Sequence, residues 1–173
     1  MARLCIIPAR SGSKRIPKKA IKEFHGKPIM AYSIEAAVRS KLFDEVMVST
    51  DSEKFAEIAR FYGAKTPFLR SVENSSDHAT TLDAIKEVLN HYSFNGREFD
   101  EICCLYPAAP LITAEHLLEA HAELKKGHSC VFAAVKYGHP IQRAFQKAER
   151  RPLPEHALQP ENRRSRRRSC DLP

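Results

Sequence analysis

The sequence lacks any apolar stretch that approaches the roughly 20 residues needed to cross a bilayer. Its first apolar run is interrupted by Pro8 and Arg10, which excludes the long hydrophobic segment of a secretory signal. We therefore expect a cytoplasmic protein with no membrane partner. With 173 residues, 43% of them hydrophobic and 28% charged, the chain has the composition of one globular domain with a sizeable core.

Cysteine pairs of the Cys-x-x-Cys type are also absent, and none of the eight histidines has metal-ligand spacing. A zinc site and a disulfide framework are therefore improbable, and we predict no metal ligands in this sequence. Four of the five cysteines lie in apolar runs that resemble strands, where a free thiol behaves as a small hydrophobe. These four are Cys5, Cys103, Cys104 and Cys130.

Neither of the two common phosphate-binding motifs occurs, since Gly-x-x-x-x-Gly-Lys-Ser/Thr and Gly-x-Gly-x-x-Gly are both missing. A different phosphate signal follows the short apolar run Leu4–Ile7, which has the length of a buried parallel strand. The loop after it carries Gly12, which lets backbone N–H groups approach a ligand, and several cations that would neutralise phosphate charge. The alternative is a solvated basic surface loop. The basic residues are Arg10, Lys14, Arg15, Lys18 and Lys19.

The remaining pattern alternates short apolar strands with helices of ten to fifteen residues, which is typical of parallel βαβ units with right-handed crossovers. We expect an α/β fold of the Rossmann-like, three-layer type, with a mostly parallel sheet and helices on both faces. Thr50–Glu53 has capping-box spacing, and Thr113 is a plausible N-cap. The expected strands are 4–7, 45–49, 102–106 and 129–135, and the expected helices cover 30–38, 55–62, 82–92 and 114–124.

Regularity ends beyond Tyr137, where prolines and an arginine-rich run dominate. We expect a nucleotide-binding domain over residues 1–138 and an irregular Arg/Pro-rich tail over 139–173 with little packed structure. The net charge of +7 favours anionic partners. Nucleic-acid binding is the rival interpretation, but no aromatic-laced basic sheet or recognition helix accompanies the charge, so we expect no nucleic-acid partner.

The segment Ile7–Lys14, with Pro17 and Lys19 after it, resembles the opening signature of the CMP-sialic acid synthetase family of cytidylyltransferases. Within that family it looks closest to the bacterial pseudaminic acid branch. Two further blocks match downstream, Arg70 with Asp77–Thr81 and Leu105–Leu111. The resemblance implies the nucleotide-diphospho-sugar transferase type of fold and transfer of CMP from CTP to a sugar acid, with release of pyrophosphate.

The resemblance also implies roles for individual residues. Arg10 and Lys19 are the expected catalytic residues, and Lys19 would meet the leaving group, where charge builds in the transition state. The family follows that lysine with asparagine, whereas this chain has Ala20, so one ligand contact is missing. The expected triphosphate contacts are Ser11, Gly12, Ser13 and Lys14, and the expected cytidine contacts are Arg70, Ala79 and Thr81.

Simpler alternatives stand beside three of these roles. Thr80 and Thr81 would equally serve as helix caps. Asp51, at the end of the second strand, would assist a metal or hold a loop, and the loop role is favoured. Arg15 and Lys18 are interpreted as solvated charges. Tyr106 and Ala108 stand where sialic acid synthetases carry a glutamine-rich version of the block, which favours pseudaminic acid as the sugar.

The expected partners are CTP and a nonulosonic acid, with the CMP-sialic acid or CMP-Kdo reaction as the nearest alternative. A catalytically silent remnant that binds CTP or other anions is the alternative from a different class. The family implies a Mg²⁺ cofactor, held by an acidic pair in a segment beyond residue 173, and a homodimer. The chain as given is therefore expected to react below the normal rate, because the metal would stabilise the transferring phosphoryl group.

Overall fold

The computed structural model describes residues 1–135 and 138 of the chain. Met1–Phe132 form one compact unit, and a second unit begins at Ala133. The tail expected over residues 139–173 lies outside the described part. Within that part, no helix is long and apolar enough to span a membrane.

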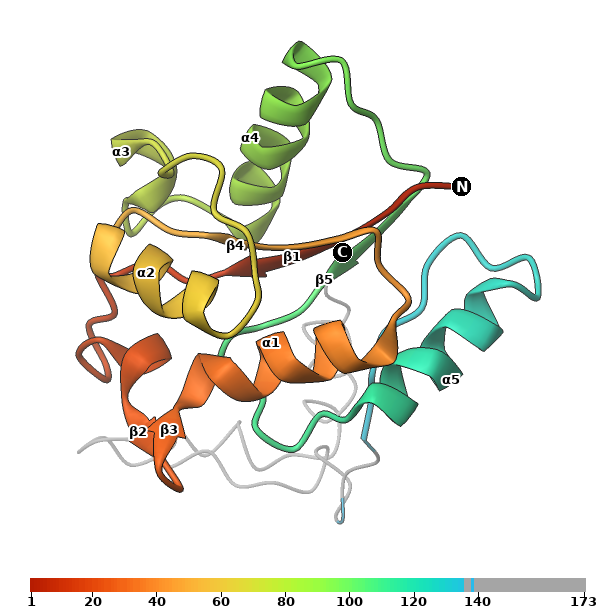
Figure 1. The fold of residues 1–173 in the computed structure, drawn as a ribbon, viewed down its shortest axis with the longest axis horizontal. Coiled ribbons are helices and arrows are strands. Elements are labelled where there is room, and N and C mark those ends of the chain that lie inside the picture. The colour runs from red at the N-terminus through yellow and green to blue at the C-terminus, as the bar shows by residue number, and fades with distance from the viewer. Residues whose placement is uncertain (136–137, 139–173) are drawn as a thin grey trace, which may run out of the picture. The chain divides into compact units, whose positions relative to one another are not determined.

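A three-stranded parallel sheet forms the centre of the unit Met1–Phe132, with the strand order β4-β1-β5 (Figure 1). The strands are β1 (Arg3–Pro8), β4 (Glu45–Ser49) and β5 (Glu101–Cys104). Leu4 lies opposite Glu45 on one side and Ile102 on the other, so β1 is the central strand. Because it has a neighbour on both edges and helices over both faces, Leu4, Cys5, Ile6 and Ile7 are fully buried. The continuous apolar run of this strand is the pattern expected there.

Helices cover both faces of the sheet, as the alternation of strands and helices predicts (Figure 1). Successive side chains of a strand point to opposite faces. Cys5 and Ile7 accordingly join one apolar cluster with α1 (Ile29–Ser40), α2 (Glu53–Phe61) and α5 (Ala114–Leu124). Leu4 and Ile6 join a second cluster with Val88 and Tyr92 of α4 (Thr81–Phe94). The Rossmann-like three-layer arrangement of the sequence prediction is therefore confirmed.

Three small elements carry the chain between these layers, and none of them was expected. A 3-10 turn, η1 (Lys19–Ile21), buries Ala20 in the cluster beneath α1 and α2. A tight hairpin follows, made of β2 (Glu23–Phe24) and β3 (Lys27–Pro28), with Gly26 at φ +82° in its turn. The third element is the one-turn helix α3 (Val72–Ser75), which lies inside the polar loop before α4.

Several local predictions agree with the structure. The strand Glu45–Ser49 has the bounds that were expected. Gly63, at φ +95°, follows the end of α2, where only glycine adopts the left-handed conformation without strain. Thr113 caps α5, with its hydroxyl accepting a hydrogen bond from the His116 amide.

The capping box expected at Thr50–Glu53 is wrong. The N-cap of α2 is Ser52, and no side-chain capping bond forms there. Thr50 is fully buried, and its hydroxyl accepts a 3.3 Å hydrogen bond from the Ser52 amide. Glu53 is paired with Arg60 instead of reaching back to the backbone. The spacing of a capping box is therefore present without its hydrogen bonds.

The strand expected over residues 129–135 is also wrong, because the structure gives no strand there. Phe132 and Val135 are 81% and 93% exposed. A strand requires a neighbour for its N–H and C=O groups, and among the described residues the sheet ends at β5. For the same reason β5 is only half-buried, and its residues Ile102 and Cys104 are exposed. The thiols of Cys104 and Cys130 are both exposed, and not buried as expected from their apolar surroundings in the sequence.

Candidate functional site

The site is built where the loops after β1 and β4 meet, at the carboxyl edge of the sheet. Pro8 lies beside Ser49 in the parallel register, and the Ala9 amide donates to the Ser49 carbonyl at 2.9 Å. The Arg70 amide donates to the Thr50 carbonyl at 2.8 Å, which brings a third segment to the same edge. Open parallel sheets bind ligands at this edge of their strands.

Asp51 fixes the start of the basic loop. Its carboxylate accepts hydrogen bonds from the Ser11 amide at 2.7 Å and from the Ser11 hydroxyl at 2.6 Å. Burial acts to raise the pKa of Asp51, but the bonds from Ser11 and the charge of Arg70 outweigh it, and the pKa lies below its ordinary value. Asp51 therefore stays ionised and holds the loop, which is the role favoured from the sequence.

Two cations of the basic loop share one carboxylate of the next loop. Arg10 lies 3.2 Å from Asp77 through its Nη1 atom, and Lys14 contacts the second oxygen of Asp77. The same Arg10 nitrogen donates to the Ser76 carbonyl at 2.7 Å. The hydrogen bond from Lys14, followed by the charges of both cations, lowers the pKa of Asp77. The two predicted phosphate cations are thus brought together around an anion supplied by the protein.

Arg70 is buried and faces the end of β4. Its Nε donates to the Ser49 hydroxyl at 2.9 Å, and its Nη2 donates to the Ser49 carbonyl. Among the described residues, Nη1 of Arg70 has no hydrogen-bond partner. Burial lowers the pKa of the Arg70 guanidinium, although the charges of Asp51 and Glu87 oppose that change. Part of this side chain therefore organises the site, and one nitrogen is available to a ligand.

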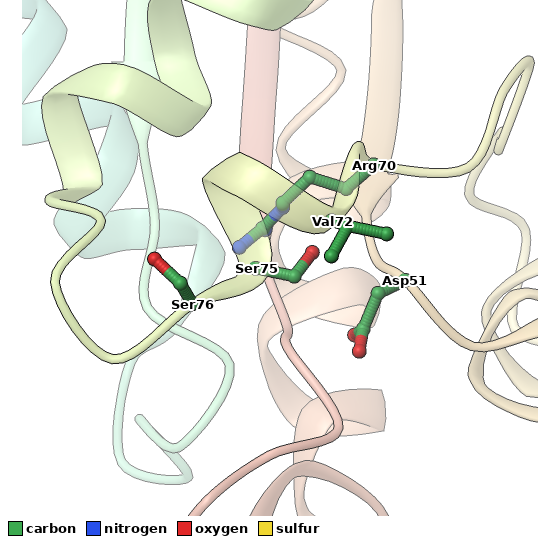
Figure 2. A pocket seen from close by; sticks show the side chains of 5 residues that line it. All are labelled: Asp51, Arg70, Val72, Ser75 and Ser76. Atoms are coloured by element: carbon green, nitrogen blue, oxygen red, sulfur yellow. The ribbon is translucent and has the colours of Figure 1, made fainter.

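A pocket of roughly 400 Å³ lies beside these groups. Figure 2 shows Asp51 extending from the end of β4, with Arg70, Val72, Ser75 and Ser76 contributed by the following loop and α3. Glu87 of α4 holds that loop in place. It accepts hydrogen bonds from the Ser71 amide at 2.8 Å and from the Asn74 amide group at 2.6 Å. The volume is that of a small-molecule site.

The remaining cytidine candidates lie at the start of α4. Thr80 forms a full capping box with Asp83, so the helix-capping alternative holds for Thr80. The hydroxyl of Thr81 lies 3.3 Å from the Tyr106 hydroxyl, which joins α4 to the loop after β5. Ser33 of α1 secures that loop by donating to the Tyr106 carbonyl at 2.8 Å. Ala79 is half-buried in the segment that precedes the helix.

The other loop candidates are exposed or half-buried. Gly12 has no atom within 4 Å of the position that a Cβ would take, so a ligand has room beside its backbone. Ser13 is half-buried and donates its amide to the Ser11 carbonyl at 2.9 Å. Lys19 begins η1 and is exposed, and its ammonium contacts no carboxylate in the part of the chain that the structure describes. Arg15 and Lys18 are exposed, as expected of solvated charges.

Magnesium does not fit the described residues. They contain no group of three or more His, Cys, Asp or Glu side chains placed to hold a metal ion. Asp51 is occupied by Ser11, and Asp77 is occupied by Arg10 and Lys14. Mg²⁺ is usually held by one or two carboxylates together with waters and substrate phosphates, and both of these carboxylates are already engaged by protein groups.

Asp77 and Glu87 are the site residues that were not predicted from the sequence. Asp77 falls inside a block that was recognised, but its pairing with Arg10 joins residues 67 positions apart, from 10 to 77. Glu87 lies on the polar side of a helical pattern, where a solvated charge is the ordinary expectation. Only the arrangement of the loops in space shows what these carboxylates bind.

Comparison with known proteins identifies the family of the chain. The sequence profile of the cytidylyltransferases matches residues 4–149. Pseudaminic acid cytidylyltransferase of Campylobacter jejuni subsp. jejuni serotype O:23/36 is 45% identical over 146 residues, covering 84% of this chain and 63% of that protein. N-acylneuraminate cytidylyltransferase of Escherichia coli O18:K1:H7 is 37% identical over 142 residues, covering 80% of this chain and 32% of that protein. The chain thus spans less than two thirds of the length of these relatives.

Two solved structures share the fold. A cytidylyltransferase from Leptospira borgpetersenii serovar Hardjo-bovis matches with a TM-score of 0.58 and 26% identity, over 75% of this chain and 51% of that one. A CMP:2-keto-3-deoxy-manno-octonic acid synthetase complexed with CTP matches with a TM-score of 0.61 and 24% identity, over 73% and 48%. The profile match covers residues 4–149, which is most of the chain, and it shows that the chain belongs to the cytidylyltransferase family.

Proposed function

We propose that this chain carries the nucleotide site of an enzyme that transfers CMP from CTP to a nonulosonic acid and releases pyrophosphate. The observation that carries the proposal is the meeting of a basic loop and a pocket at one edge of the sheet. Arg10 and Lys14 stand on the loop, and Asp51 and Arg70 line the pocket. A nucleoside triphosphate would need such a combination, with cations for its phosphates and a pocket nearby for its base.

In the proposed reaction, a hydroxyl of the sugar acid attacks the α-phosphorus of CTP and the bond to pyrophosphate breaks. Such transfers need positioning and charge stabilisation and no covalent intermediate on the protein. Arg10 and Lys14 would neutralise the oxygens of the leaving pyrophosphate, together with the backbone around Ser11, Gly12 and Ser13. Lys19 would stand at the far end of the loop, near the α-phosphate, where negative charge builds as the bond breaks.

The base would lie in the pocket beside Arg70. The free Nη1 of Arg70 is a donor suited to the carbonyl oxygen of cytosine. Ala79 and Thr81, at the start of α4, are proposed as further contacts of the cytidine. Asp51 lines the same pocket, and its proposed role is to hold the basic loop. Its carboxylate accepts hydrogen bonds from the amide and the hydroxyl of Ser11, which fixes the start of that loop.

The sugar acid proposed is pseudaminic acid, and the relative named for that substrate has 45% identity to this chain. Tyr106 supports the assignment because it stands in the loop after β5, with its hydroxyl 3.3 Å from that of Thr81, where it would contact a sugar joined to the α-phosphate. Magnesium would reduce the negative charge of the phosphates when bound. We propose that its ligands come from outside residues 1–135, since the carboxylates described at this site are already paired.

A pyrophosphate-release assay with CTP and Mg²⁺ tests the proposal, with pseudaminic acid and N-acetylneuraminic acid compared as acceptors. The expected result is release that requires both CTP and an acceptor, faster with pseudaminic acid, and lost in a variant with Arg10→Ala and Lys14→Ala. Binding of CTP without release for any acceptor would contradict the enzyme and support a silent CTP-binding protein. Equal release with ATP would contradict the cytidine pocket.

A further inference from the structure

Asp77 occupies the cations that the proposed function assigns to phosphate. One carboxylate oxygen faces Arg10 at 3.2 Å and the other contacts Lys14, so each oxygen serves one cation. All three side chains reach solvent, with exposed fractions of 35% for Arg10, 80% for Lys14 and 39% for Asp77. The arrangement is that of a bound anion, except that the protein itself supplies the anion.

A triphosphate cannot take both cations while the carboxylate stays in place. Like charges brought to one site repel each other, so phosphate oxygens and Asp77 compete for Arg10 and Lys14. Exposed ion pairs are weak, because water and salt screen them. A ligand that carries several negative charges can therefore displace the carboxylate, at a cost in affinity.

We propose that Asp77 is an internal counter-ion, which holds the phosphate cations in the free protein and is displaced when a polyphosphate binds. The inference rests on the proposed function, because it takes Arg10 and Lys14 as phosphate ligands. It adds a role for a carboxylate that neither binds substrate nor holds a metal. Asp77 lowers the affinity of the free site for any polyphosphate and so favours ligands that also fill the pocket.

Displacement of Asp77 would also affect the pocket, because Asp77 directly follows two residues that line it. Ser75 and Ser76, which precede it, line the pocket, and the Ser76 carbonyl accepts the 2.7 Å bond from Arg10. When a phosphate draws Arg10 and Lys14 away, the segment that ends at Asp77 loses its contacts with the basic loop. Phosphate binding and rearrangement of one pocket wall are therefore linked, because both depend on the same contacts of Arg10 and Lys14.

The test measures the affinity of the protein for inorganic pyrophosphate by calorimetry, without a base to fill the pocket. Asp77→Asn removes the charge and keeps the size of the side chain, and Asp77→Glu keeps the charge. Glu73→Gln is the matched control, because Glu73 is an exposed carboxylate of the same loop with no ion pair in the described part of the chain. Thermal unfolding of each variant shows whether it is folded.

Asp77→Asn is expected to bind pyrophosphate roughly 3- to 30-fold more tightly than the parent, the range given by two weak exposed ion pairs. Its affinity should also fall more steeply as salt is added, because the cations no longer have an internal partner. Asp77→Glu and Glu73→Gln should bind within about twofold of the parent, since one keeps the pairing and the other never had it.

Unchanged or weaker binding by folded Asp77→Asn would overturn the counter-ion role and assign Asp77 to loop structure or to the ligand itself. An equal gain in Glu73→Gln would overturn it too, since the effect would then be one of net charge. A different failure belongs to the proposed function. If neither the parent nor any variant binds pyrophosphate or CTP, then Arg10 and Lys14 are not phosphate ligands, and both proposals fall.

Discussion

The carboxylate of Asp51 accepts hydrogen bonds from both the amide and the hydroxyl of Ser11, at 2.7 Å and 2.6 Å, although the two residues are 40 positions apart in the sequence. This pair ties the loop after β1 to the loop after β4. A flexible basic loop would spend binding energy on becoming ordered when it grips a phosphate. Because Asp51 holds its first turn in advance, the loop is partly organised before any ligand arrives.

Replacing Asp51 by alanine should therefore weaken pyrophosphate binding several-fold and lower the stability of the fold. The lost bonds are charge-assisted and half-exposed, so the free energy of unfolding should fall by about 1–2 kcal/mol. The folded pKa of Asp51 is depressed, so its contribution is present above its unfolded pKa and is lost as pH falls through the folded value. Thermal unfolding at pH 7 and pH 3 measures this. Glu57→Gln, on the exposed side of α2, is the control and should change neither quantity.

Lys19→Ala should lower turnover by roughly 10²–10³ and leave CTP affinity nearly unchanged. The reason is its position at the far end of the loop, where it would meet charge that develops only in the transition state. Lys19 is exposed, so the substitution should not unfold the protein. Lys22→Ala removes an equally exposed cation three residues later and should have little effect. If Lys19→Ala and Lys22→Ala reduced turnover equally, Lys19 would be only part of a diffuse positive surface.

Arg70→Ala should weaken CTP binding more than pyrophosphate binding, because Arg70 faces the pocket and the phosphate cations stand on another loop. The same substitution should also lower the stability of the fold. The Ser49 hydroxyl and carbonyl lose their donor in a buried place, which should lower the free energy of unfolding by about 1–3 kcal/mol. Binding is therefore measured at a temperature where the variant is folded. Equal loss of both ligands would assign Arg70 to the phosphates or to the fold.

The parts of the fold that depend on local pattern could be predicted from the sequence. The buried run Leu4–Ile7, the strand Glu45–Ser49 and the cap at Thr113 all follow from residues close together in the chain. The strand expected over 129–135 failed for a physical reason. Apolar composition makes a segment suited to a sheet, but only a neighbouring strand can satisfy its backbone.

The sequence predicts several of the residues that belong to the candidate site, but it does not predict which of their side chains pair with one another. The sequence places Arg10 and Lys14 on the loop after the first strand and Arg70 in a later polar loop, and the fold brings these loops to one edge of the sheet. The sequence does not show that Asp77 pairs with Arg10 and Lys14. Nor does it show that two nitrogens of Arg70 donate hydrogen bonds to Ser49. Side-chain pairing across loops depends on distances that no spacing within one segment reveals.

Glu45 provides a test that separates the stability of the fold from the site. Its buried carboxylate, at the amino end of β4, accepts hydrogen bonds from Tyr92, Arg97 and Lys65. Burial acts to raise the pKa of Glu45, but these bonds outweigh it and the pKa is lowered. Its stabilising effect is therefore present above its unfolded pKa and is lost as pH falls through the lower folded value.

Glu45→Gln should accordingly lower the free energy of unfolding by about 1–3 kcal/mol near neutral pH and by less in acid, where Glu45 itself is protonated. CTP affinity should be unchanged, because the amino ends of the strands lie away from the site. Chemical denaturation at pH 7 and pH 3.5 gives the two stabilities, and calorimetry gives the affinity. A loss of CTP affinity in the folded variant would show that the two ends of the sheet are coupled.

Thermal stabilisation of this chain by CTP, compared with ATP, GTP and inorganic triphosphate at equal concentration, tests whether the site is specific for cytidine. A cytidine pocket joined to a phosphate loop predicts the largest shift with CTP, equivalent to about 2.7 kcal/mol at one hundred times its dissociation constant. Arg10→Ala combined with Lys14→Ala should abolish it. Equal shifts with all four ligands would contradict the account and reduce the site to a basic surface that binds any polyphosphate.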